Sequence, residues 1–335
     1  MVFYILKRVF WVIPMLLGMT LVVFTLSHII PGDPVATALG PLATKAAVER
    51  LKEAWRLDDP LPIQYLRYLK AMATGDLGFS VYTRRPVTSD IKKYFMATFE
   101  LSTVSLLIAM VGGIVLGAIS AARKNGILDF MVRPLSLFGM SMPVFWVGLL
   151  ILLLFYYKLG LIPIGRRIGL FIDPPATITG MYIVDSLLTG NWTALGSAIH
   201  HVIGPALCLA LCPLAIIARQ TRSNLLEALD EDYIGTARAK GMSEGIVVLK
   251  HALRNALLPI VTITGIQYGY LLGSSVMAEV IFSWPGIGRY ALAAIRHLDF
   301  QPVLGFSVVM ALVYMLVNLV VDVSYVYINP KVRFS

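Results

Sequence analysis

Six apolar segments interrupt this sequence, and none of them contains a lysine or an arginine. Each segment reaches the roughly 20 residues that an α-helix needs to cross the hydrocarbon core of a bilayer. Only two acidic residues, Glu279 and Asp322, fall inside them, as expected when burying a charge in hydrocarbon costs about 2.5–3.5 kcal/mol or more. The sequence therefore predicts transmembrane helices over residues 9–30, 101–122, 134–157, 199–218, 257–282 and 303–328.

The composition supports the same class of protein. Of the 335 residues, 58% are hydrophobic and 14% are charged, whereas an ordinary soluble domain has about 25% charged residues. So few charges cannot cover the surface of a soluble fold of this length. The first segment follows Lys7 and Arg8, as a signal peptide would, but it is too long and lacks a small-residue cleavage site. We therefore expect an all-α polytopic membrane protein with a retained first helix.

Basic residues predict the orientation of the chain. With a cytoplasmic N-terminus, the shorter inner connections carry thirteen Lys and Arg residues, and outer connections of nearly equal total length carry five. This asymmetry follows the positive-inside rule, places both termini in the cytoplasm and accounts for the net charge of +9 without a nucleic-acid partner. The inner connections are residues 1–8, 123–133, 219–256 and 329–335, and the shorter outer ones are 158–198 and 283–302.

The spans divide the chain into three parts. Residues 1–30 hold the first helix, 31–100 form an external segment, and 101–330 form a five-helix core. Helical spacing of apolar residues predicts two amphipathic helices in the external segment, the second starting at the prolines near residue 60. Their apolar positions are Val48, Leu51 and Trp55 in the first helix, and Tyr65, Leu66, Leu69 and Met72 in the second.

The connection 219–256 is the most informative inner segment. Small residues alternate with charges over residues 232–241, and Gly241 is a typical helix end. Ser243 is then a favourable N-cap for a helix that continues to Leu253. Two short helices around a glycine predict a rigid elbow that another protein can approach closely. The alternative interpretation is a basic loop held at the lipid surface.

No catalytic chemistry is visible in the sequence. A nucleotide-binding loop needs a Gly-Lys pair, which the chain lacks, and no nucleophile–base constellation occurs. His201, Cys208 and Cys212 share one helix face and could bind a transition metal. Buried free cysteines usually only pack, so packing is the favoured interpretation. We predict that the chain is not an enzyme and binds no metal or cofactor itself.

Prolines and glycines are frequent inside the predicted spans and favour broken or closely packed helices, as in a transporter. The prolines are Pro143, Pro205, Pro213 and Pro259, and Gly265, Gly269 and Gly273 form a small-residue stripe. A polar path through the membrane is predicted to be lined by Pro143, Gln267, Tyr270, Ser274 and Glu279.

Five stretches resemble the permease subunits of bacterial ABC importers. Residues 231–241 and 251–259 are similar to the cytoplasmic loop of these permeases, and more narrowly to the dipeptide/oligopeptide/nickel group. The likeness extends over nearly the whole chain and is greatest to the B-type permease of dipeptide importers. The other matching stretches are 30–34, 141–146 and 279–289.

This resemblance implies one pore-forming subunit of an ATP-driven importer of dipeptides or short oligopeptides, in the inner membrane of a prokaryotic cell. It implies a homologous C-type permease, two cytoplasmic ATPase subunits that bind ATP and Mg, and an external substrate-binding protein. The general pattern of a Glu-Ala-Ala coupling helix is replaced here by Gly235, Thr236 and Ala237. The ATPase-coupling residues carried over are Asp232, Tyr233, Thr236, Ala237, Arg238, Ala239, Lys240 and Gly241.

Other functions remain open from the sequence. The same architecture could import nickel, glutathione or oligosaccharides. A stand-alone secondary transporter or channel would need ionisable groups near the middle of a span, and none is well centred. A membrane receptor or scaffold would not need broken helices.

Overall fold

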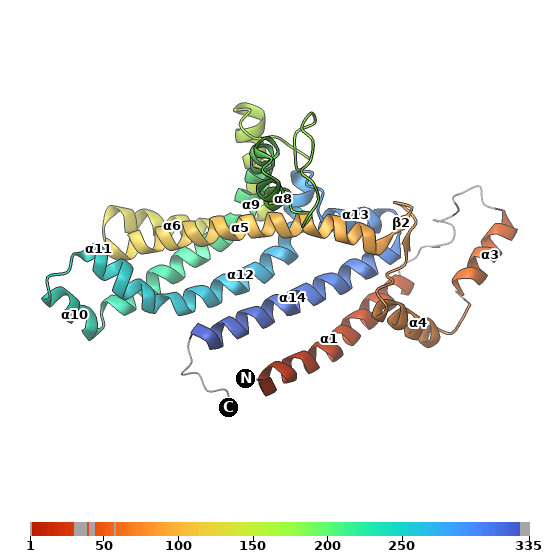
Figure 1. Cartoon of the computed structure of the whole chain (residues 1–335), viewed down its shortest axis with the longest axis horizontal. Coiled ribbons are helices and arrows are strands. Elements are labelled where there is room, and N and C mark those ends of the chain that lie inside the picture. The colour runs from red at the N-terminus through yellow and green to blue at the C-terminus, as the bar shows by residue number, and fades with distance from the viewer. Residues whose placement is uncertain (1, 30–38, 40–43, 57, 329–335) are drawn as a thin grey trace. The chain divides into compact units, whose positions relative to one another are not determined.

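The computed structural model describes residues 2–29, 39, 44–56 and 58–328, and helices dominate these residues (Figure 1). The chain separates into two compact units. The first unit comprises Met1–Thr98 and Pro285–Met315, and the second comprises Phe99–Trp284 and Leu316–Ser335. Two long helices, α5 (Val87–Ala122) and α14 (Phe300–Ile328), contribute to both units.

Aromatic and hydroxyl contacts hold α1 (Val2–Ile29) against α4 (Leu61–Ala73) in the first unit. Thr20 Oγ1 lies 3.0 Å from the Tyr65 hydroxyl, and Phe24 packs on the Tyr65 ring with 5.3 Å between the centroids. The two amphipathic helices predicted within residues 31–100 are present as α3 (Lys45–Trp55) and α4, while their external location stays a prediction. Leu66, predicted on the apolar side of α4, is instead exposed, because α4 buries only one narrow side against α1.

A two-residue hairpin of β1 (Phe79–Ser80) and β2 (Arg85–Pro86) precedes α5 in the first unit. Gly78, just before β1, has a φ of +83°, a left-handed conformation that favours glycine. Asp299, just before α14, accepts hydrogen bonds from Ser80 Oγ at 2.7 Å and from the Tyr82 N–H at 3.0 Å. These contacts fix the hairpin beside α13 (Ile287–Arg296) and the start of α14.

The second unit is built around the long helix α9 (Trp192–Leu229), which α5, α6 (Ile127–Ser141) and α12 (Leu253–Ile281) surround. Glycines allow the close contacts. A Cβ on Gly117 of α5 would lie 2.5 Å from the Ala218 carbonyl oxygen, and one on Gly139 of α6 would lie 3.0 Å from Ala215 Cβ. In the predicted glycine stripe of α12, Gly265 packs directly on Val321, whereas Gly273 faces open space.

Three helices are long and apolar enough to cross a membrane, Val87–Ala122, Trp192–Leu229 and Phe300–Val321. Two bent pairs bring the number to five if each pair is one span, and α1 holds a shorter apolar stretch, Ile13–Leu26. Each predicted span thus coincides with a helix or a bent pair, while the count of six spans and the placement of both termini stay predictions. These statements cover the described residues.

The bends occur at only two of the four predicted prolines. Pro143 separates α6 from α7 (Val144–Ile151), which runs on into η1 (Leu152–Lys158), with a bend of 107°. A bend of 57° lies just before Pro259. Pro205 and Pro213 lie inside α9, which continues past both, so the expectation of breaks there is wrong. The packing of neighbouring helices keeps α9 continuous, because its central residues are among the most buried of the unit.

Hydropathy also misplaced two boundaries. The helix α5 begins at Val87, well before residue 101, because the apolar window detects only the part suited to hydrocarbon. The outer connection predicted over 158–198 contains α8 (Tyr182–Thr189) and the first turns of α9. The rest of that connection, from Leu159 to Met181, is non-helical.

Candidate functional site

The predicted elbow is present as two short helices around Gly241. The helix α10 (Asp232–Ala239) follows α9 closely, and Gly241, two residues after its end, has a φ of +74°. The chain then enters α11 (Glu244–Ile246), η2 (Val247–Ala252) and α12 in direct succession, so the helix predicted to end at Leu253 continues past the 57° bend before Pro259 to Ile281. Figure 1 shows α10 and α11 at the same end of the second unit, and α10 packs against η2.

Buried residues attach α10 to the helix bundle. Ile234 is fully buried and belongs to one core cluster with Leu225 of α9 and Val247 of η2. Ala237, one turn further along α10, is buried in the same cluster. The elbow is therefore packed against the end of α9 and against η2, from which α12 continues.

The exposed side of α10 carries most of the predicted coupling residues. Ala237 is the exception, because it points into the core and cannot contact a partner. An ion pair between Arg238 Nε and Glu244 Oε1, 2.7 Å apart, closes the elbow. Ser243 occupies the N-cap position of α11, but its side chain makes no capping hydrogen bond. The exposed residues are Asp232, Tyr233, Thr236, Arg238, Ala239, Lys240 and Gly241.

A buried ionic cluster that the sequence analysis missed joins α5, α6 and α9. Asp129 is fully buried and accepts hydrogen bonds from Arg222 Nε at 2.6 Å and from Ser120 Oγ at 2.6 Å. The Asn125 N–H, 2.9 Å away, and the Arg133 guanidinium complete its partners. An acidic residue in the predicted inner connection 123–133, with arginines nearby, was the available signal. The pairing itself depends on tertiary contacts.

The predicted pore-lining residues do not share one surface in this chain. Glu279 is completely buried and Gln267 is nearly so, whereas Tyr270 and Pro143 are exposed. Ser274 is half-buried between these extremes. An exposed position in this single chain can face lipid or another subunit, so the path-lining role of the five residues stays a prediction. The side chain of Asp322 lies outside the described residues.

His201, Cys208 and Cys212 all lie in α9, where His201 contacts the helix backbone and Cys208 contacts α7. The His201 ring Nδ1 lies 2.7 Å from the Ser197 carbonyl oxygen, and Cys208 Sγ donates to the Val144 carbonyl at 3.4 Å. Cys208 is buried and Cys212 is half-buried. Among the described residues, no three His, Cys, Asp or Glu side chains gather closely enough to hold a metal ion.

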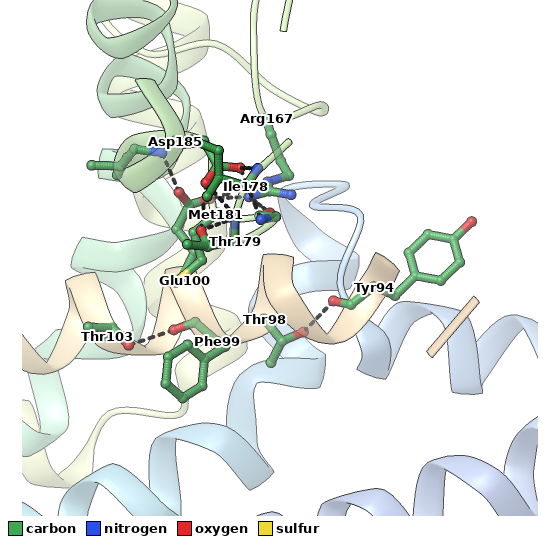
Figure 2. A network of polar contacts seen from close by, with 12 residues as sticks. Tyr94, Thr98, Phe99, Glu100, Thr103, Arg167, Ile178, Thr179, Met181 and Asp185 are labelled. Carbon is green, nitrogen blue, oxygen red and sulfur yellow. Dashed lines mark hydrogen bonds and ion pairs between the residues drawn. The ribbon is translucent and has the colours of Figure 1, made fainter. Parts of the chain in front are cut away.

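A second polar network orders the predicted outer connection 158–198 (Figure 2). Arg167 donates to Glu100 Oε2 from Nη2 at 2.5 Å, and its guanidinium stacks on the Tyr182 ring at 3.9 Å. Asp185 accepts bonds from the Thr179 N–H at 2.7 Å and the Gly180 N–H at 2.9 Å. Burial alone would raise the pKa of Asp185, but these hydrogen bonds outweigh it and hold the pKa below its usual range.

Comparisons with known proteins extend over the full chain. Residues 113–334 match the family described as the inner membrane component of binding-protein-dependent transport systems, and residues 1–102 match its N-terminal part. The chain is 44% identical over 326 residues to the probable D,D-dipeptide transport system permease protein DdpB of Escherichia coli strain K12, covering 97% of this chain and 96% of the relative. It is 41% identical over 334 residues to the dipeptide transport system permease protein DppB of Alkalihalophilus pseudofirmus, covering 100% of both. It is also 37% identical over 332 residues to the glutathione transport system permease protein GsiC of Pectobacterium atrosepticum, covering 99% of each chain.

Proposed function

This chain belongs to the family of inner membrane components of binding-protein-dependent transport systems, and from that premise we propose that it is the B-type, pore-forming permease of an ATP-driven importer of dipeptides or short oligopeptides. The observation that carries the substrate class is identity over essentially the whole chain to permeases named for dipeptide transport. Glutathione is the second candidate, favoured by the 37% identity to a glutathione permease.

The motor of this importer is a separate protein in our proposal. The chain has no Gly-Lys pair and hence no nucleotide-binding loop. Two cytoplasmic ATPase subunits bind ATP and Mg, a homologous C-type permease completes the pore, and an external binding protein delivers the peptide. The complex resides in the inner membrane of a prokaryotic cell.

Coupling runs through the elbow. The exposed residues of α10, from Asp232 to Lys240, contact the ATPase, while buried Ile234 connects α10 to the helix bundle. Movement of α10 then shifts the end of α9, and the ion pair between Arg222 and Asp129 passes that shift to α6. In this proposal ATP binding and hydrolysis bias two arrangements of the bundle that contains α9 and α12.

The direct test is to purify the tagged chain with mild detergent from its native membrane and identify the accompanying proteins by mass spectrometry. A second permease, ATPase subunits and an external binding protein are expected. Vesicles containing that complex should accumulate a radiolabelled dipeptide only when ATP and the binding protein are supplied. Competition with unlabelled glutathione separates the two substrate candidates. Transport by the purified chain alone, without ATP, would contradict the proposal and indicate a secondary transporter.

A further inference from the structure

A cavity of about 680 Å³ opens in the first unit, between the C-terminal end of α1, α4, the β1–β2 hairpin and the start of α14. This volume lies within the roughly 300–1,000 Å³ of typical small-molecule sites. Its described lining includes none of the predicted coupling or path-lining residues. The wall includes Phe24, Leu61, Arg67, Asp76, Phe79 and Leu304.

The cavity lies where two apolar helices reach the edge of the membrane. Phe24 belongs to the apolar stretch Ile13–Leu26, which ends close to the C-terminal end of α1. Leu304 belongs to the apolar helix Phe300–Val321, near its first residue. The other walls come from α4 and the hairpin, in the connection 31–100 outside the predicted spans. The cavity therefore lies at the boundary between hydrocarbon and water, where amphipathic groups collect.

Apolar side chains at this cavity are left uncovered. Leu61, at the start of α4, is 53% exposed and Phe79 of β1 is 55% exposed, although both lie outside the predicted spans. Covering apolar surface is worth about 25 cal/mol per Å². A ligand of this cavity is therefore expected to carry an apolar part that packs against these two side chains.

The cavity also presents one accessible charge of each sign. Arg67 of α4 is partly exposed and contacts Asp59 through Nη2 alone, so its other N–H groups are available to bind an oxyanion. Asp76 is exposed, and its Oδ1 accepts a hydrogen bond from the Gly78 N–H at 2.9 Å. Within the described part of the chain, Asp76 forms no ion pair, so its carboxylate is available to a cation.

A second carboxylate in the wall is already used by the fold. Asp299 is 3% exposed and accepts the hydrogen bonds from Ser80 and the Tyr82 N–H that fix the hairpin. The accessible charges are thus one cation and one anion. A purely anionic ligand would satisfy Arg67 and be repelled by Asp76, whereas a zwitterion satisfies both.

We propose that this cavity binds a zwitterionic glycerophospholipid of the phosphatidylethanolamine type. Arg67 binds the phosphate and Asp76 the ammonium group, while the acyl chains start against Leu61 and Phe79 and continue along the membrane-spanning helices. A dipeptide is also a zwitterion, but the position at the membrane boundary favours a ligand with a long apolar part. The inference does not rest on the proposed function.

The bound lipid joins elements that are distant in the sequence. Its site takes residues from α1, α4, the hairpin and α14, all within the first unit. A ligand that binds only the folded arrangement of these elements stabilises that arrangement by mass action. The lipid is therefore a structural ligand of the first unit, and removing it should lower the thermal stability of the protein.

The first test measures lipid binding by native mass spectrometry of the complex, purified through a tag on this chain, delipidated in detergent and mixed with palmitoyl-oleoyl phosphatidylethanolamine. In Arg67→Gln/Asp76→Asn, the apparent affinity should fall about tenfold, the size expected from two partly exposed charge contacts. The matched control, Lys70→Gln/Asp58→Asn, removes one exposed charge of each sign outside the cavity and should bind like the wild type. Equal affinity in the first variant and the wild type would overturn the proposal, as would equally tight binding of phosphatidylglycerol to the wild type.

The second test fills the cavity without changing its charges. Ala71 of α4 lines the cavity, so Ala71→Phe should abolish the rise in unfolding temperature that added phosphatidylethanolamine gives the wild-type complex. Ala73→Phe, at an exposed position of the same helix outside the cavity, should keep that rise. An equal rise in both variants would contradict binding in this cavity.

The third test identifies the occupant in the native membrane. Phe79 is replaced by photoreactive p-benzoylphenylalanine, and the illuminated complex is analysed by mass spectrometry. An adduct with a phospholipid supports the proposal, whereas an adduct with another protein, or no lipid adduct, refutes it. Displacement of bound phosphatidylethanolamine by millimolar dialanine would also refute it and indicate a peptide site.

Discussion

The buried carboxylate of Asp129 accepts two hydrogen bonds from the Arg222 guanidinium, at 2.6 Å from Nε and 3.0 Å from Nη2. This bidentate pair joins the first turn of α6 to the final turns of α9. Such paired, charge-assisted bonds fix geometry as well as adding energy. The pair links the end of α9, from which the elbow projects, to α6, which leads into the bent α6–α7 segment. It therefore ties together two elements that move together in our proposal.

Removing the arginine should leave a buried charge with incomplete compensation. We expect Arg222→Met to lower the free energy of unfolding by about 2–3 kcal/mol, below the full cost of an unpaired buried charge because Arg133 still contacts Asp129. Thermal unfolding in detergent measures this loss. Arg133→Met is the control, and its effect should be smaller because the Arg133 side chain is half exposed. Adding Asp129→Asn to Arg222→Met should recover part of the stability, and no recovery would contradict the buried-charge explanation.

Gly241→Asp should uncouple ATP hydrolysis from transport while leaving the protein in the membrane. Gly241 has a φ of +74°, where a residue with a side chain is strained, so the substitution distorts the elbow locally. Arg238→Glu should have a similar effect, because it breaks the ion pair with Glu244 and reverses a charge on the exposed side of α10. ATP hydrolysis and dipeptide uptake are measured together in vesicles.

The matched control for the elbow is Gly245→Asp, in α11. A side chain there meets no atom within 4 Å and the backbone is not left-handed, so uptake should stay near the wild-type rate. Normal import by both Gly241→Asp and Arg238→Glu would show that the elbow does not couple the ATPase to the bundle.

Gly117 should tolerate no side chain. A Cβ at this position would lie 2.5 Å from the Ala218 carbonyl oxygen and 2.6 Å from Thr221 Cβ. Gly117→Ala is therefore expected to cost about 1–3 kcal/mol through overpacking between α5 and α9. Gly196→Ala in α9, where nothing lies within 4 Å, should be neutral or slightly stabilising. The stabilities of the two variants are compared by thermal unfolding in the same detergent. Equal stability would contradict the close contact between α5 and α9.

The stability of the polar network around Asp185 should decrease as the pH falls and not as it rises. Because the folded-state pKa of Asp185 is lowered, its contribution to stability is fully present above the ordinary aspartate pKa of about 3.9 and is lost as the pH falls through the lower folded-state pKa. Limited proteolysis of the connection 158–198 should therefore be slow at neutral pH and become faster only in strong acid, measured with an acid-active protease at the low end. Asp185→Asn should raise cleavage at neutral pH and remove most of this dependence. Exposed Asp173→Asn should behave like the wild type.

Local features of the sequence predicted much of this chain correctly. Apolar segments located every long helix, because burial in hydrocarbon depends on the composition of each segment alone. The positive φ of Gly241 and the helix on either side were likewise accessible from residue type and spacing. The same information misplaced the start of α5 and overestimated Pro205 and Pro213 as breaks, because helix ends and prolines respond to their packed surroundings.

Residue types and their spacing alone determined the membrane class, the long helices and the glycine-centred elbow, since these follow from local hydropathy and backbone freedom. Only the tertiary structure decided that Arg222 pairs with Asp129 and that Ala237 faces inward. These contacts depend on which helix faces pack together, and each contact joins positions far apart in the chain. No single segment encodes such a pairing, because its energy exists only once both helices are packed.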